Sequence, residues 1–270
     1  MQQNYFESSL GQTGIKVQRL GLSGTYRPGV ATIHKAFDEG LNYFFCYGID
    51  TQMIKVLRDI SKSKRENLII ATGAYNLLVG HPNLRRTLEK RLRQLGTDYI
   101  DVFLFLGVMK QKHFGKRELE EMIRFREEGK VRSIGISCHN RKFAGELAAS
   151  GVLDVVMIRY NAAHRGAELD IFPYLKNHNT GVVGYTATRW KYLMRRPKAW
   201  SKDKPLPTAG MCYRFVLSNP NIHVCMTAPS NLKQLEENLA AFRKGSLPED
   251  EMQLMQEFGD VVYNEKRWFM

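Results

Sequence analysis

Two histidines and two cysteines are the side chains whose types could do chemistry near neutral pH. His139 and His164 each follow an apolar, strand-like run, and an imidazole titrates close to pH 7, so either could act as an acid or a base. Cys46 ends another such run and Cys138 ends the run that His139 follows, and a thiol or metal-binding role is conceivable for both. Lys110 follows a further run and could reach inward. The plainer interpretation is solvated histidines, an exposed lysine and buried cysteines that pack as small apolar residues.

A basic and aromatic segment, residues 189–204, is the second feature with chemical potential. It reads RWKYLMRRPKAWSKDK, with seven basic and three aromatic residues. Such a segment could bind an anionic substrate or a pyrophosphate, or it could contact an acidic protein partner or a membrane surface. We interpret it as a mobile lid near a binding site.

Composition limits the classes of protein that these residues can belong to. The chain has 270 residues, a formal net charge of +13 and 43% hydrophobic residues, which is typical of a globular protein. The longest apolar run, residues 102–109, is far shorter than the ~20 residues that span a bilayer. The N-terminus has no signal-peptide core, so the sequence predicts a cytoplasmic protein.

The spacing of the cysteines and the net charge limit which metals, cofactors and macromolecules the chain is expected to bind. The four cysteines are far apart and form no C-x-x-C pair, which excludes a disulfide framework and the usual structural zinc patterns, and we predict no metal site. The positive charge suits solvated helix faces or an anionic ligand such as a phosphorylated cofactor. No nucleic-acid motif accompanies it, so a nucleic-acid partner is not expected.

Strand-like and helix-like segments alternate along the whole chain. Strands are expected at residues 20–23, 42–45, 68–72, 100–106, 131–137, 155–158, 181–185 and 222–226. Helices are expected after them at residues 30–39, 50–60, 84–95, 118–128, 142–150, 169–178, 209–217 and 232–242. Eight such units within one domain, residues 1–270, favour a closed (β/α)8 TIM barrel. A doubly wound open sheet is the alternative, but no Gly-rich phosphate loop follows the first strand.

Two further elements flank these units. Residues 5–10 and 15–19 enclose a glycine-containing turn, which predicts a β-hairpin that caps the bottom of the barrel. A last helix is expected between about residue 248 and residue 262.

The order of these units and their local sequences resemble those of the aldo-keto reductase superfamily. The matching segments, which cover nearly the whole chain, are LGQTGIKVQRLGLSG (10–24), GLNYFF (40–45), LRQLGTDYIDVFLF (92–105), EEGKVRSIGIS (127–137), RYNAAHRGAE (159–168), GVVGYT (181–186), FVLSNPNIHV (215–224) and SNLKQLEENL (230–239). The resemblance implies an aldo-keto reductase barrel with NADP(H) or NAD(H) across the carboxyl ends of its strands, here called the mouth. It also implies reduction of carbonyl groups.

The resemblance also shows where this chain departs from the family's catalytic tetrad. In the family a tyrosine donates the proton, a lysine and an aspartate tune that tyrosine, and a histidine holds the carbonyl group. Tyr47 stands in the tyrosine's position, in a loop shortened by about three residues. Phe45, Gly73 and Leu106 stand where the aspartate, lysine and histidine are expected. Because a tyrosine has a pKa of about 10, losing the ammonium group weakens it as an acid near neutrality.

The cofactor positions are better retained. The residues that the resemblance assigns to the cofactor are Ser137, Cys138, Tyr185, Thr186, Ser230, Gln234 and Asn238. Tyr185 would stack on the nicotinamide, Thr186 would donate to the pyrophosphate, and the pair Gln234 and Asn238 would read the adenine end. Met157 replaces the family's glutamine. Residues 227–230 offer hydroxyl groups but no cation for a 2′-phosphate, so NADP is not favoured over NAD.

Three functions remain open at this point. The first is a divergent oxidoreductase that acts on a small-molecule substrate through altered acid–base residues, with His139 and His164 as replacements. The second is a catalytically degenerate barrel that binds a cofactor, a ligand or a protein partner. The third is a barrel re-used for lyase or isomerase chemistry. We favour the first because ionisable residues remain at the mouth, and we expect little turnover of simple aldehydes.

Overall fold

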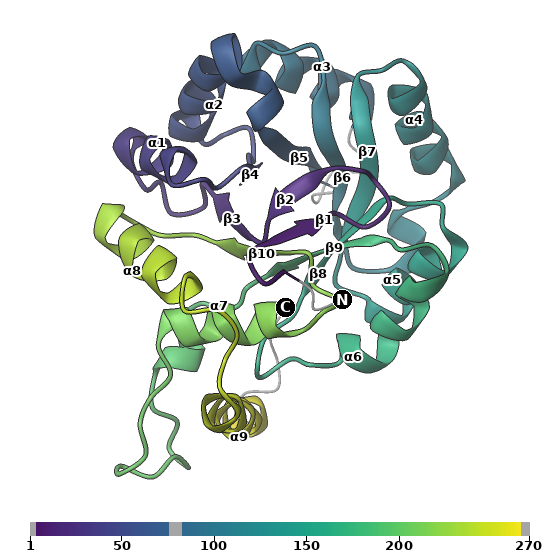
Figure 1. Cartoon of the computed structure of the whole chain (residues 1–270). Helices are drawn as coiled ribbons and strands as arrows, with labels where there is room; N and C mark the ends of the chain where they lie inside the picture. Colours follow the sequence, from purple (N-terminus) through teal and green to yellow (C-terminus); the bar gives the residue numbers. More distant parts are fainter. Residues whose placement is uncertain (1–3, 76–82, 266–270) are drawn as a thin grey trace.

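Eight parallel strands close into a barrel in the computed structural model, which describes residues 4–75 and 83–265. The barrel strands are β3 (Leu20–Ser23), β4 (Tyr43–Phe45), β5 (Ile69–Tyr75), β6 (Ile100–Val108), β7 (Val131–Cys138), β8 (Val155–Arg159), β9 (Gly181–Tyr185) and β10 (Val224–Thr227). Each strand pairs with the next, and β10 pairs with β3 to close the ring (Figure 1). The predicted (β/α)8 barrel is therefore confirmed, and the open sheet is excluded.

Helices surround this barrel. They are α1 (Val30–Asp38), α2 (Thr51–Lys64), α3 (Leu84–Leu95), α4 (Lys116–Glu127), α5 (Arg141–Ser150), α6 (Ala167–Asp170), α7 (Ala209–Ser218), α8 (Leu232–Phe242) and α9 (Glu249–Glu265). Short 3-10 helices are η1 (Arg65–Asn67), η2 (Gln111–His113), η3 (Phe172–Asn177) and η4 (Tyr192–Met194). On α3, Leu84, Leu88, Leu92 and Leu95 are all buried. The Asn83 side chain caps this helix by accepting from the Arg86 amide.

Alternation along the strands divides the apolar residues into two cores. On β8, Val155 and Met157 belong to the cluster inside the barrel, whereas Val156 and Ile158 belong to the cluster between the strands and the helices. Successive side chains of a strand point to opposite faces, so residue 159 returns to the inner face. The side chains that follow the inner cluster toward the carboxyl ends of the strands are therefore those that can form a site.

An antiparallel hairpin closes the opposite end of the barrel. Its strands are β1 (Glu7–Ser9) and β2 (Lys16–Gln18). The buried side chains of Leu10, Ile15 and Val17 join the inner cluster, and the Gln12 amide donates to the carbonyl oxygen of Asn179 at 2.8 Å. The predicted hairpin cap is confirmed, and Figure 1 shows it lying across the barrel.

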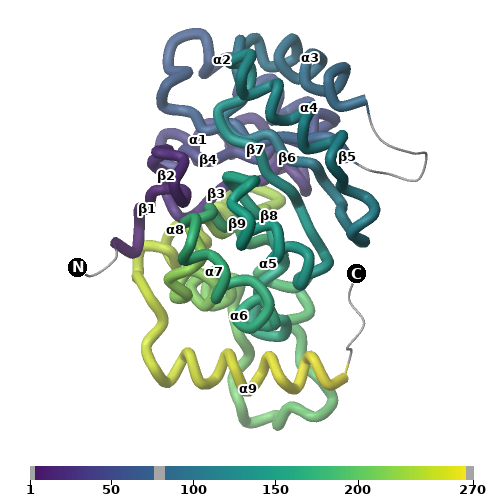
Figure 2. The backbone as a smooth tube through the Cα atoms, turned by 90° about the vertical axis from the view of Figure 1, so that its right-hand side faces the viewer, coloured from purple at the N-terminus to yellow at the C-terminus, as the bar shows by residue number. Residues whose placement is uncertain are grey.

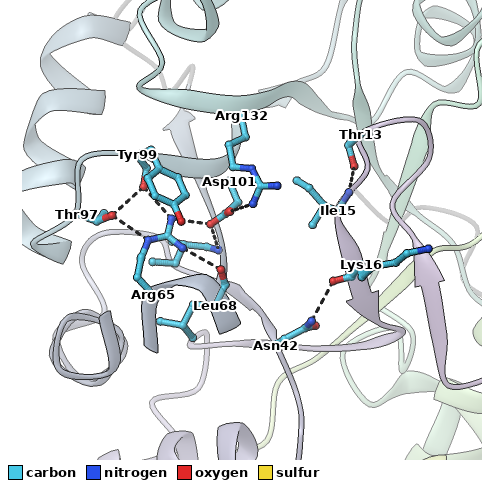
Figure 3. A network of polar contacts seen from close by, with 11 residues as sticks. Thr13, Ile15, Lys16, Asn42, Arg65, Leu68, Thr97, Tyr99, Asp101 and Arg132 are labelled. Atoms are coloured by element: carbon cyan, nitrogen blue, oxygen red, sulfur yellow. Dashed lines mark hydrogen bonds and ion pairs between the residues drawn. The ribbon is translucent and has the colours of Figure 1, made fainter. Parts of the chain in front are cut away.

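A buried carboxylate ties three barrel strands together at this same end (Figure 3). Asp101 on β6 is fully buried, and its oxygens accept from Arg65 at 2.7 Å, from Arg132 at 2.9 Å and from the Ile70 amide at 2.9 Å. Removing one partner of such a buried ion pair typically costs about 3–5 kcal/mol. The network therefore stabilises the barrel at a distance from its mouth.

The helix predicted at residues 169–178 is wrong in type. The structure has one short turn, α6, followed by η3. Pro173 lies at the start of η3 and has no amide hydrogen to donate, so an α-helix cannot run through it.

The basic segment is more firmly held than a mobile lid. Leu193 and Trp200 are buried, and the Trp200 ring packs edge-on against Phe258 of α9, with ring centroids 4.9 Å apart. The Arg196 guanidinium donates to the carbonyl oxygens of Ser201 and Lys204 and so closes the loop on itself. Figure 2 shows this loop beyond α9, along one side of the barrel. No described helix is long and apolar enough to cross a membrane.

Candidate functional site

A cavity of about 300 Å³ opens at the mouth of the barrel. All eight barrel strands contribute to its wall, either from their last residues or from the turns that follow. Its aromatic lining residues are Tyr26, Phe45, Tyr47, Tyr75, Tyr185, Trp190 and Tyr213. No Asp, Glu, Lys or Arg is found among the described residues that line it. The cavity therefore suits a small, flat or apolar molecule that is oriented by a few neutral polar groups.

Tyr47 points into this cavity from the turn after β4. Its hydroxyl accepts from the Thr25 hydroxyl at 3.3 Å. Its ring lies nearly parallel to that of Tyr75, with centroids 6.0 Å apart, and meets the Phe45 ring edge-on at 4.7 Å. The shortened loop thus leaves Tyr47 at the mouth, with its ring held between aromatic neighbours.

The lysine position is closed to any side chain. A Cβ atom added at Gly73 would lie 2.0 Å from the Leu104 carbonyl oxygen, because β5 and β6 approach each other closely there. Phe45 and Leu106 line the cavity as apolar walls. Burial raises the pKa of the Tyr75 hydroxyl above its usual value, so that this neighbour of Tyr47 stays protonated near neutrality.

His139 and Tyr185 form a second polar pair at the mouth. The Tyr185 hydroxyl lies 3.4 Å from both ring nitrogens of His139, and the two rings meet edge-on with centroids 5.9 Å apart. Burial raises the pKa of Tyr185, while the nearby Arg159 opposes that shift. Ser137 lines the same wall. An imidazole and a protonated phenol are therefore in contact beside the cavity.

His164 lies elsewhere. It is buried, its ring packs edge-on against Tyr263, and it does not belong to the described cavity lining. Burial and the positive charges of Arg159, Arg189 and Arg141 lower its pKa to about 3. An imidazole with that pKa stays neutral at physiological pH, so the structure does not favour the predicted acid–base role for His164.

Neither cysteine at the mouth faces the cavity. Cys46 and Cys138 belong to the outer core, where the Cys46 thiol lies 3.4 Å from Asp50 and the Cys138 thiol donates to the Asn140 carbonyl oxygen at 3.1 Å. Burial raises the pKa of Cys138 to about 12 and also raises that of Cys46. Thiol chemistry is therefore not favoured, and the cofactor contact expected of Cys138 stays a prediction. Lys110 is exposed.

The predicted cofactor residues fall into two groups. Tyr185, Thr186 and Ser137 line the cavity, and Thr186 has a φ of 58° with its hydroxyl donating to the Tyr185 carbonyl oxygen at 2.7 Å. This half of the site offers an aromatic face and hydroxyl groups, which suit a nicotinamide ring.

The second group lies on α8 and in the turn before it, outside the described cavity lining. The Gln234 amide oxygen accepts from the Ser230 amide at 2.9 Å, and the buried Asn238 amide donates to the Thr227 hydroxyl at 3.0 Å. These side chains hold the turn that leads into α8. An adenine moiety would have to replace the Ser230 contact of Gln234, so the adenosine half fits less well than the nicotinamide half.

Sequence reasoning missed Tyr75, which lines the cavity, and Arg159, which lies next to it outside the described lining. Both lie at the end of a strand that runs further than its apolar residues, β5 and β8. Arg159 shares the inner face with Met157 and pairs in register with Tyr185. The alternation of side chains along a strand, continued two residues beyond Met157, would have placed Arg159 on the inner face.

Comparisons with known proteins agree with this architecture. A model of the Aldo/keto reductase family matches residues 25–193. L-galactose dehydrogenase of Arabidopsis thaliana is 24% identical over 86% of this chain and 86% of its own length, and the uncharacterized oxidoreductase YqkF of Bacillus subtilis is 22% identical over 92% and 94%. The holo structure of aldo-keto reductase AKR11C1 from Bacillus halodurans superposes with a TM-score of 0.77 at 19% identity, covering 93% of this chain and 95% of that one.

Proposed function

Because the chain belongs to the aldo/keto reductase family, we propose that it is a nicotinamide-dependent oxidoreductase that acts on a small carbonyl compound or alcohol. The observation that carries this proposal is the cavity at the mouth, where Tyr185 and Ser137 lie together with Tyr47 and His139. An aromatic wall beside hydroxyl and imidazole groups provides both a place for a nicotinamide and groups that can move a proton.

Different residues of the cavity bind the cofactor and transfer the proton. The Tyr185 ring and the Ser137 hydroxyl hold the nicotinamide, which when bound supplies or accepts a hydride. The Tyr47 hydroxyl donates to the substrate oxygen, and the surrounding aromatic rings exclude water. No ammonium group among the described residues that line the cavity stabilises the phenolate, so proton transfer is slower than with a tuned tyrosine. A lost acid–base contribution is typically worth about 10²–10⁴-fold.

His139 gives the site a second proton-transfer group. Its ring lies 3.4 Å from the Tyr185 hydroxyl at the wall of the cavity. Imidazole groups are the most common general acids and bases in enzyme sites. We propose that His139 replaces part of the missing acid–base machinery.

We propose in addition that the substrate carries an anionic group. Arg159 is paired in register with Tyr185, which lines the cavity, so it lies next to the mouth although it is not among the described lining residues. Arg141 is the second arginine on this side, since both act electrostatically on His164. The carboxylate of Asp170 already binds Arg141 at 2.7 Å. A guanidinium group recognises carboxylates and phosphates well, so this side of the mouth favours an anion.

A second function is supported by the closed position at Gly73. Because no lysine can stand beside Tyr47, the barrel could bind a nicotinamide cofactor, or a protein partner, without turning over a substrate. The lyase or isomerase alternative depends on Tyr47 and His139 alone, since His164 and the cysteines lie outside the described cavity lining.

The experiment is a calorimetric titration of the purified protein with NADPH and NADH, followed by a turnover screen over aldehydes, ketones and alcohols. Micromolar binding with turnover that is lost in Tyr47→Phe supports the oxidoreductase. Stoichiometric binding without turnover over the whole panel supports the non-catalytic alternative. If neither cofactor binds, the oxidoreductase and the cofactor-binding alternative are both wrong, and only binding of a protein partner remains of the second function.

A further inference from the structure

A buried carboxylate holds the turn that carries Tyr47. Asp50 is 7% exposed and directly precedes α2, yet its side chain caps none of that helix's amides. Its Oδ1 instead accepts from the Gly48 amide at 2.9 Å, and its Oδ2 accepts from the Tyr47 amide at 3.3 Å. The carboxylate therefore stabilises the turn at residues 47 and 48 and does not cap the helix.

A guanidinium group holds the same turn by its carbonyl oxygens. Arg91 reaches across from α3, and its Nη2 donates to the Tyr47 carbonyl oxygen at 3.0 Å while its Nη1 lies 3.4 Å from that of Gly48. Gln94 accepts from Arg91 at 2.8 Å and orients it. The amides of the turn are thus bound from one side and its carbonyl groups from the other.

Two glycines make room for these charged groups. Gly48 has a φ of 81°, and a Cβ atom there would lie 1.8 Å from the Arg91 Cζ atom. A Cβ atom at Gly24 would lie 2.5 Å from Asp50 Oδ2. Side chains at either position would displace the groups that hold the turn, so the two glycines belong to the same arrangement.

We propose that Asp50 and Arg91 are positioning residues that fix the Tyr47 side chain at the mouth. This inference rests on the proposed function of Tyr47 as proton donor. The hydroxyl of Tyr47 has no charged partner among the described lining residues of the cavity. Its place therefore depends on the backbone of residues 47 and 48, together with the packing of Tyr75 and Phe45. The carboxylate and the guanidinium act on the backbone rather than on the acidity of the phenol.

The first test measures amide hydrogen exchange of peptides that span residues 46–49 in the full chain. We expect faster exchange in Asp50→Ala, where both acceptors are lost. In Asp50→Asn one oxygen is retained and an NH₂ group faces the other amide, so exchange should be intermediate. Arg91→Lys should also speed exchange because one ammonium group cannot bridge two carbonyl groups. The matched controls are Asp59→Ala on the exposed side of α2 and Arg93→Lys on α3, which should leave these peptides unchanged.

The second test measures turnover with bound cofactor. A misplaced proton donor can lower kcat about 10²-fold while substrate affinity changes little, so Asp50→Ala and Arg91→Lys should lower kcat and leave KM within about threefold. A variant that is merely destabilised would instead show faster exchange throughout the barrel.

Tyr47→Phe separates the two proposals. It retains the peptide groups that Asp50 and Arg91 bind, so its exchange should match that of the wild type. Full turnover in Tyr47→Phe would show that the proposed reaction role is wrong, while local exchange in the other variants would still support the positioning. Unchanged exchange in both Asp50→Ala and Arg91→Lys would overturn the positioning, whatever the turnover.

Discussion

Gly73 and Leu104 approach each other so closely that a Cβ atom at residue 73 would lie 2.0 Å from the Leu104 carbonyl oxygen. The two residues are paired in register across β5 and β6. The missing lysine is therefore a property of the backbone as well as of the sequence, because no side chain fits without moving a strand. A single substitution cannot restore the family's lysine in this barrel.

Gly73→Ser should consequently destabilise the protein and should not increase its activity. Forcing atoms into a packed core typically costs about 1–3 kcal/mol, and here the clash is with backbone. Urea unfolding at neutral pH measures the change. Gly115→Ser is a matched control, because Gly115 is the N-cap of α4 and serine is accepted there at least as well as glycine. An equal and small effect of both substitutions would show that β5 and β6 can separate.

The second prediction distinguishes the ring of Tyr185 from its hydroxyl group. If the ring forms the wall for the nicotinamide, Tyr185→Ala should weaken NADH or NADPH binding about tenfold or more, since stacking and buried aromatic area are lost. Tyr185→Phe should change the affinity by less than about threefold, because only the hydroxyl contacts with His139 and Ser137 are removed. Calorimetry measures both. Tyr174→Ala, at an exposed tyrosine of η3, should have no effect.

The fold could be predicted from sequence more completely than the mouth, for physical reasons. Apolar runs such as residues 155–158 mark a strand buried on both faces, so the barrel order was predictable. The residues at the ends of the strands were not predictable, because Tyr75 and Arg159 lie where the apolar pattern stops. The close approach at Gly73 depends on how two strands pack, and the lowered pKa of His164 depends on distant arginines. Neither leaves a local sequence signal.

The third prediction concerns stability at acid pH. The pKa of His164 is about 3 in the folded protein and close to 6.5 when the chain is unfolded, so the unfolded state binds the proton more tightly. Stability is therefore full above about pH 6.5 and falls as the pH decreases toward 3. At pH 4.5 the loss from this residue is roughly 2–3 kcal/mol.

Urea midpoints at pH 7 and pH 4.5 test this expectation. His164→Gln removes the titrating group and should reduce the pH dependence of stability. It should not abolish that dependence, because burial also lowers the pKa of His223, to about 4, and this contributes in the same direction. The same pH dependence in wild type and His164→Gln would show that His164 is protonated as readily in the folded state as in the unfolded state.

The last prediction tests the proposed preference for an anionic substrate. Arg159 lies on the inner face of β8 beside Tyr185. A guanidinium group there should favour an aldehyde that carries a carboxylate, such as succinic semialdehyde, over butanal, which has the same carbon number. We expect kcat/KM to be about tenfold higher for the charged aldehyde, which corresponds to about 1.4 kcal/mol, and the difference to shrink as salt concentration rises.

Arg159→Met should remove this preference by lowering kcat/KM for the charged aldehyde alone, whereas Arg159→Lys should retain part of it because the charge remains without the planar guanidinium group. Arg93→Met removes a charge from the exposed side of α3 and controls for the net charge of the protein. If Arg159→Met lowers kcat/KM equally for both aldehydes, Arg159 supports the structure of the mouth and does not recognise the substrate. A preference for butanal in the wild type would show that the rim repels the anion, and the proposed substrate class would be wrong.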